Sequence, residues 1–119
     1  MATSADELFV CDREANIIRV FSLAGNHLRD IKGGWERPEG IVFHRDRLFV
    51  TTAIGSSFIH VITPDGQPLQ KYKVLDDDGS EVIRVNSMTL LGKNLIASCS
   101  KKDPATGHWR YKLLALKGL

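Results

Sequence analysis

Residues 6–12 read DELFVCD, residues 46–52 read DRLFVTT, and residues 93–99 read KNLIASC. Each of these stretches opens with polar residues and continues into a short apolar segment. When they are aligned on their leucines, the three stretches lie 40 and then 47 residues apart. Self-similarity at a period of this size indicates a repeated structural unit.

Further apolar runs surround each stretch in the same order. The runs that follow are NIIRVFS at 16–22, SFIHVIT at 57–63 and RYKLLAL at 110–116. The first two of them end in turns with glycine in register, Gly25 and Gly66, and lead into HLRDIKG and PLQKYKV. The runs before the second and third stretches are PEGIVFH at 38–44 and VNSMTLL at 85–91.

These runs predict short antiparallel strands. They are rich in β-branched and aromatic residues and are bounded by Gly, Pro, Asn and Asp, while the sequence has no competing apolar stripe of helical period. Four strands in 40 to 47 residues match the size of one blade of a β-propeller. We therefore expect an all-β fold, a partial β-propeller built of four-stranded antiparallel blades.

The order of the runs resembles the repeat of the NHL family and of related six-bladed propellers. The resemblance rests on Pro-x-Gly-Ile at 38–41, Leu-Phe-Val-x-Asp at 8–12 and Asn-x-Ile-x-Val-Phe at 16–21. The letters Asn-His-Leu at 26–28 are a coincidence, because they fall one turn later than the Asn-His position of the family. The repeat around them carries the resemblance.

With strands labelled A to D from the propeller axis outward, residues 1–119 form a single partial propeller of about two and a half blades. We expect strands B to D of a first blade at about 6–33, a whole second blade at about 38–75, and strands A to C of a third at about 85–119. Such a piece leaves blade faces and strand edges uncovered. The chain is therefore expected to be a fragment of a larger propeller, or to assemble with copies of itself, with a dimer favoured.

The charge balance does not by itself indicate nucleic acid or a membrane surface as a partner. The chain has 16 basic and 14 acidic residues, so its formal net charge of +2 gives no argument for nucleic acid or for a membrane surface. No apolar run approaches the roughly 18 residues of a membrane span, and no signal-peptide pattern is visible at the start. We expect a cytoplasmic protein with two free thiols, Cys11 and Cys99, although a disulfide between them is the alternative.

The resemblance implies that the loops joining strand B to C, and strand D to the next A, share a ligand-holding face. The residues expected on this binding face are Arg13, Trp35, Arg37, Lys101, Lys102, His108 and Trp109. Trp35 suits either a surface contact or packing between blades. The basic residues near Trp109 suit either a solvated loop or an RNA-binding face, and the acidic run at 76–78 opposes phosphate binding.

A metal site is a further alternative. Glu39 and Asn86 occupy the same position in consecutive blades, just before strand A. In gluconolactonase-like propellers, which the Pro-x-Gly pattern also resembles, such groups near the channel bind a divalent metal that polarises a lactone or ester. Oxygen ligands suit Ca²⁺ or Mg²⁺, but two ligands are too few for a complete site.

No nucleophile motif, phosphate-binding loop or dinucleotide fingerprint is present in the sequence. The favoured hypothesis is a non-enzymatic propeller segment that acts as a protein-interaction scaffold, needs no cofactor, and assembles with itself to close a ring. The alternatives are a metal-dependent lactonase-like or esterase-like propeller that uses Glu39 and Asn86, and an RNA-binding face of the NHL type.

Overall fold

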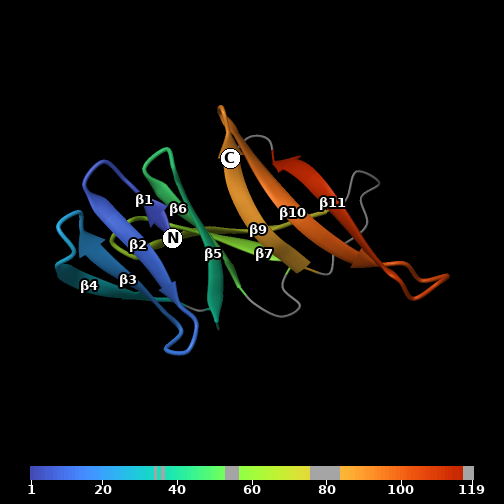
Figure 1. The fold of residues 1–119 in the computed structure, drawn as a ribbon, viewed down its shortest axis with the longest axis horizontal. Coiled ribbons are helices and arrows are strands. Elements are labelled where there is room, and N and C mark those ends of the chain that lie inside the picture. The colour runs from blue at the N-terminus through green and yellow to red at the C-terminus, as the bar shows by residue number, and fades with distance from the viewer. Residues whose placement is uncertain (34, 36, 53–56, 76–83, 117–119) are drawn as a thin grey trace.

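The computed structural model describes residues 1–33, 35, 37–52, 57–75 and 84–116. This part of the chain forms three antiparallel sheets of four, four and three strands (Figure 1). The expected all-β partial propeller is confirmed. None of the described segments is a helix long and apolar enough to cross a membrane.

The first sheet contains its strands in chain order. They are β1 (Ala2–Thr3), β2 (Glu7–Asp12), β3 (Ile17–Ser22) and β4 (His27–Lys32). The repeat predicted no strand before residue 6, yet β1 pairs antiparallel with β2. A strand of two residues is too short to show a periodic pattern. The first blade therefore has its inner strand, and Ala2 lies in the core.

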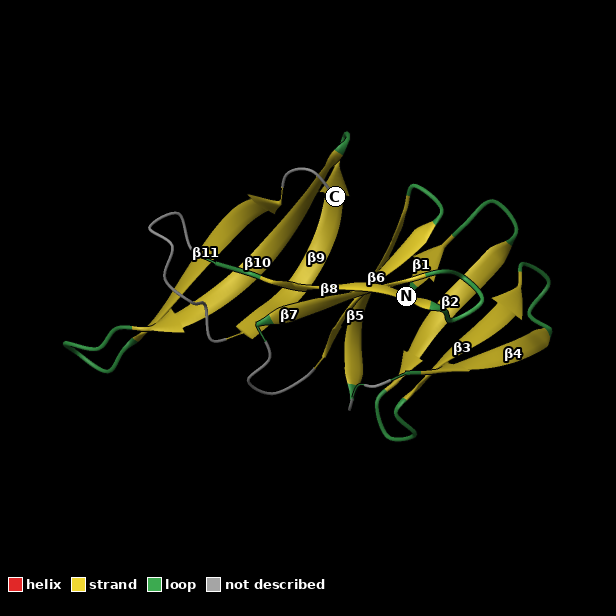
Figure 2. Ribbon diagram, turned by 180° about the vertical axis from the view of Figure 1, so that it is seen from behind, coloured by secondary structure: helices red, strands yellow, loops and turns green. Residues whose placement is uncertain are grey.

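The second and third sheets follow the order of the sequence repeat. The second consists of β5 (Pro38–His44), β6 (Arg47–Thr52), β7 (Phe58–Ile62) and β8 (Pro68–Lys73). The third consists of β9 (Arg84–Leu91), β10 (Asn94–Lys102) and β11 (Trp109–Leu116), with β10 in the middle. The three sheets lie side by side, with the second sheet between the first and the third (Figure 2).

Side chains of the second sheet enter two separate cores, because successive residues of a strand point to opposite faces. Leu48 and Val50 of β6 pack against the first sheet, and Phe49 between them packs against the third. A strand buried on both faces reads as a continuous apolar run. This explains why β6 is LFV rather than an alternation of apolar and polar residues.

The strands farthest from the inner strands are polar. β4 and β8 are mostly exposed and lie at one end of their sheets in the strand order. Exposed, charged strands at a sheet edge reduce uncontrolled pairing with other chains. The inner strand β5 instead contacts β1, β2 and β9, so the three blades join along their inner strands.

Candidate interaction surfaces

The β2–β3 turn and the connection from the first to the second sheet lie side by side. The Asn16 Oδ1 atom accepts a hydrogen bond of 2.7 Å from the backbone N–H of Arg37. Both residues have left-handed backbone conformations, with φ of 58° and 52°, which asparagine tolerates better than most residues. Two loops of the kinds assigned to the binding face are thus held together.

Arg13 and Glu39 meet at the same place. Their side chains form an ion pair with an Nη1 to Oε1 distance of 3.8 Å, and both are partly exposed. Exposed pairs of this kind contribute about 0–1 kcal/mol. The expected metal ligand Glu39 therefore has a cationic neighbour, which a bound metal ion would have to displace.

Asn86, the other expected metal ligand, is the extra residue of a β-bulge. Ser98 pairs with Ser87 and Cys99 with Val85, so Asn86 has no direct partner on β10. Strands β5 and β9 approach closely here, because a Cβ atom added to Gly40 would lie 4.0 Å from the Cα atom of Ser87. Within the described ranges, no three His, Cys, Asp or Glu side chains gather in a metal-binding group.

Trp35 is a core residue. Only 7% of its surface is exposed, and it belongs to the apolar cluster between the first and second sheets. Its ring meets the ring of His60 edge to face, with the centroids 5.7 Å apart. A Cβ atom on Gly33 would collide with the indole, so glycine is required there. The burial matches the packing alternative and removes Trp35 as an exposed anchor.

The β10–β11 hairpin carries the other basic residues of the expected face. Lys101 and Lys102 end β10, exposed His108 precedes β11, and Trp109 opens β11 with 42% of its surface exposed. Figure 1 shows this hairpin projecting from the far end of the third sheet, well away from the β2–β3 turn. The acidic run at 76–78 lies outside the described residues.

The turn of this hairpin is organised by Asp103. Its carboxylate accepts hydrogen bonds from the Ala105 N–H at 2.8 Å and from Arg110 Nε at 2.9 Å. The bond from the Ala105 backbone, followed by that from Arg110, holds the pKa of Asp103 below its usual range. Sequence reasoning found the basic residues here but missed this acidic centre.

The outer face of the third sheet carries exposed apolar side chains that the described chain does not cover. Tyr111 and Leu113 of β11 are 75% and 72% exposed, whereas the next residue, Leu114, is buried against the second sheet. Leu91 of β9 is also largely exposed. In the register of the sheet, Tyr111 and Leu113 lie opposite Ser100 and Ser98 of β10. Exposed apolar surface of this kind is typical of an interaction site.

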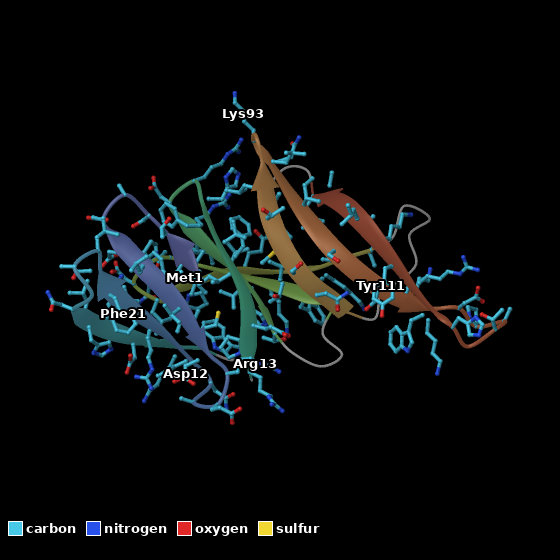
Figure 3. The ribbon with its side chains drawn as sticks, in the orientation of Figure 1. Met1, Asp12, Arg13, Phe21, Lys93 and Tyr111 are labelled. Carbon is cyan, nitrogen blue, oxygen red and sulfur yellow. The ribbon has the colours of Figure 1, made fainter. Side chains whose placement is uncertain are left out.

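The outer face of the first sheet is mixed. Leu8 and Phe21 are register partners on the face opposite the buried pair formed by Phe9 and Val20. Figure 3 shows Phe21 on the first sheet and Tyr111 at the other end of the molecule, on the third. The two outer faces therefore terminate the row of blades on opposite sides.

Charged side chains lie beside this apolar pair. Arg19 pairs with Asp12 at 3.0 Å and with Asp30 at 3.7 Å, and His27 contacts Asp30 at 2.7 Å. Hydrogen bonds from the Ala15 backbone and then from Arg19 lower the pKa of Asp12. The charged network was not predicted from the sequence, because its members are spread over three strands.

Known structures with a similar fold are propeller proteins. The chain superposes on Myxococcus xanthus glutaminyl cyclase with a TM-score of 0.69 at 18% identity, covering 89% of this chain and 47% of that one. It superposes on the RRP9 WD40 repeats with a TM-score of 0.62 at 18% identity, covering 99% and 36%. It superposes on U3-55K with a TM-score of 0.60 at 15% identity, covering 93% of this chain and 35% of that one.

These comparisons define the class of the molecule. The chain has the fold of a β-propeller segment and spans less than half the length of each of these proteins. At identities of 15% and 18%, these superpositions establish the fold and say nothing about the activity of the chain. No protein-family model matches the sequence, and no curated protein does.

Proposed function

We propose that the chain is a non-enzymatic propeller segment of the NHL type that acts as a protein-interaction scaffold and assembles with itself to close a ring. The observation that carries the proposal is the exposed apolar face formed by Tyr111, Leu113 and Leu91. In a closed propeller, this face of a blade packs against the next blade. The similarity to the RRP9 WD40 repeats supports the propeller fold on which this proposal rests. A cytoplasmic location, expected from the lack of a signal-peptide pattern, is part of the same proposal.

A second copy is the proposed occupant of this face. Two chains of three blades each, related by a two-fold axis, make one six-bladed ring in which the first blade of each chain meets the third blade of the other. Leu8 and Phe21 then lie against Tyr111 and Leu113 of the mate. Because β1 completes the first blade, only the third blade of each chain contributes three described strands.

Light scattering coupled to size exclusion tests this assembly. We expect a species of about twice the 13.3 kDa chain mass. Leu113→Glu places a charge in the interface and should give a monomer, while Leu23→Glu, at an exposed leucine of the β3–β4 turn, should leave the dimer intact. A folded wild-type monomer at micromolar concentration rejects the ring, and a trimer requires another closure.

Metal-dependent lactonase-like or esterase-like chemistry is the second candidate. It is kept because the fold is shared with an enzyme, glutaminyl cyclase, and because β5 and β9 run close together near Glu39 and Asn86. A dimer would double the number of oxygen donors facing the channel. Thermal melting with Ca²⁺, with Mg²⁺ and with EDTA tests it, because a bound metal raises the midpoint. An unchanged midpoint removes this candidate.

RNA binding is the third candidate and has the weakest support. Arg13 and Arg37 lie near the β2–β3 turn, whereas Lys102 and His108 lie on the distant hairpin, so these cations do not form one patch in a single chain. Titration with single-stranded RNA at two salt concentrations decides it. Phosphate contacts weaken as salt rises, and binding that is absent or insensitive to salt rejects this function.

A further inference from the structure

A groove of about 710 Å³ lies between the outer parts of the first and second sheets. Its walls come from the end of β4, from Gly33 and Trp35, and from the outer strands β7 and β8. It is separate from the outer face of the third sheet and from the β10–β11 hairpin. Trp35 is the one described residue that it shares with the expected loop face, and the proposed ring contacts lie elsewhere.

The indole N–H of Trp35 is a buried donor without an acceptor. Trp35 lines the groove, and its Nε1 atom makes no hydrogen bond to any residue that the structure describes. Buried donors in native proteins nearly always have a partner, and an unpaired one requires an explanation. An acceptor supplied by a bound molecule is such an explanation.

His60 of β7 is the polar neighbour of this indole. Its ring packs edge to face against Trp35 and is half-buried in the groove wall. Burial, followed by the charge of Lys71, lowers the pKa of His60, so the imidazole is neutral at neutral pH. This part of the wall is therefore polar and uncharged.

The charged side chains among the described lining residues of the groove are basic. Its described lining residues include two lysines, Lys32 and Lys71, and no carboxylate. The Lys71 ammonium lies 4.3 Å from the centroid of the Phe58 ring, which holds it on the same sheet face as its register partner His60. A ligand that complements these walls carries negative charge.

Strand β8 adds an apolar side chain and a free edge. Leu69 is 51% exposed, is the extra residue of a β-bulge in β8, and lines the groove together with Lys71. Within the described sheets, β8 pairs with β7 only. An unpaired strand edge offers main-chain hydrogen bonds to an extended peptide, and neighbouring side chains then provide specificity.

We propose that this groove binds an extended, acidic peptide segment of a partner protein along β8. The peptide places a carboxylate near Lys32 and Lys71 and an apolar side chain on Leu69, and one of its carbonyl oxygens accepts the Trp35 indole N–H. The proposal rests on the interaction role proposed above but uses a different surface. Self-assembly and peptide binding can therefore fail independently.

Nitrogen–proton correlation spectra test the proposal through the two tryptophan indole signals, assigned with Trp109→Phe. The probe is acetyl-Glu-Leu-Glu-Leu-Glu-amide, titrated into the full chain. We expect the Trp35 indole signal to move and saturate while the Trp109 signal stays in place. The same peptide with lysines replacing the glutamates should have no effect at equal concentration.

Charge variants locate the site. Lys71→Glu should weaken binding by about tenfold or more, and Lys71→Gln should weaken it less, because charge complementarity contributes to such contacts. Lys93→Glu is the matched control, since Lys93 is exposed at the tip of the β9–β10 turn (Figure 3). Trp35→Phe keeps an aromatic ring, removes the N–H, and should weaken binding without unfolding the chain.

Several results would overturn the proposal. One is an unmoved Trp35 signal at millimolar peptide, and another is equal weakening by the variants at Lys71 and Lys93. A shift produced equally by octanoate or by oligouridylate would assign the groove to small anions or to RNA instead of a peptide. Peptide binding that persists in the monomeric Leu113→Glu variant would separate the groove from self-assembly and support the proposal.

Discussion

Arg29 of β4 forms a bidentate salt bridge with the carboxylate of Glu7, with Nη1 to Oε2 at 2.7 Å and Nη2 to Oε1 at 3.1 Å. The same guanidinium donates to the backbone oxygen of Pro64, in the turn after β7, at 2.7 Å. One side chain therefore joins β2 and β4, the two neighbours of β3 in the first sheet, to the second blade. Its partners are 22 and 35 residues away in the sequence.

Replacing Arg29 should loosen the junction between the first two blades. Hydrogen bonds to charged groups contribute about 1.5–3 kcal/mol, so Arg29→Met should lower the free energy of unfolding by that amount. Urea denaturation measures the loss. Arg19→Met is the control, because Arg19 makes only partly exposed ion pairs that contribute about 0–1 kcal/mol. Equal losses of unfolding free energy in both variants would contradict a stabilising role for the Arg29 contacts.

The Glu7 contact should also make stability depend on pH. The hydrogen bond from Arg29 is the main cause of the lowered pKa of Glu7 in the folded chain. A folded-state pKa below the unfolded value of about 4.3 stabilises the fold above that pH, and this stabilisation is lost as the pH falls through the folded value.

The test compares wild type with Glu7→Gln at several pH values. The difference in unfolding free energy should be constant between pH 7 and about pH 5 and should shrink at lower pH. The comparison cancels the similar acid-range contributions of Asp12 and Asp103, which both chains share. A difference that stays constant down to pH 3 would show that Glu7 is not stabilised as a carboxylate.

Cys11 should react slowly with thiol reagents. Burial raises the pKa of its thiol to about 11, so at pH 8 only about one thousandth of it is the reactive thiolate. In a Cys99→Ala chain, the rate of reaction with Ellman's reagent should rise about tenfold per pH unit from pH 8 to pH 10. A plateau near pH 9 would indicate an ordinary, accessible thiol.

The blades could be predicted from the sequence because each propeller strand is recognisable from its local residue pattern. In β6 and β7, the spacing of apolar residues and the flanking turn residues suffice to locate each strand. β1 was missed because two residues have no period. The contacts of Arg29 were not predicted, because the sequence around residue 29 does not indicate that its partners are residues 7 and 64.

The candidate surfaces were predictable in part. Loop chemistry identified cations that the structure exposes, such as Arg13 and Lys102. The pattern of residues around Trp35 did not decide between surface and core, because tryptophan suits both and the decision depends on the room left by Gly33. In β11, the neighbouring leucines gave no sign that Leu114 is buried and Leu113 exposed, because that difference depends on which face of the strand meets the second sheet.

The two tryptophans should respond to truncation in opposite ways. Trp35 fills the junction of the first two blades, so Trp35→Ala should cost about 3–5 kcal/mol through lost burial and the resulting cavity. Trp109→Ala removes a ring that is 42% exposed and should cost about 1 kcal/mol or less. Gly33→Ala should resemble the Trp35 variant, because the added methyl group collides with the indole. Chemical denaturation of the three variants measures these losses. A Trp35→Ala chain as stable as wild type would return Trp35 to the surface and remove the buried donor on which the peptide groove depends.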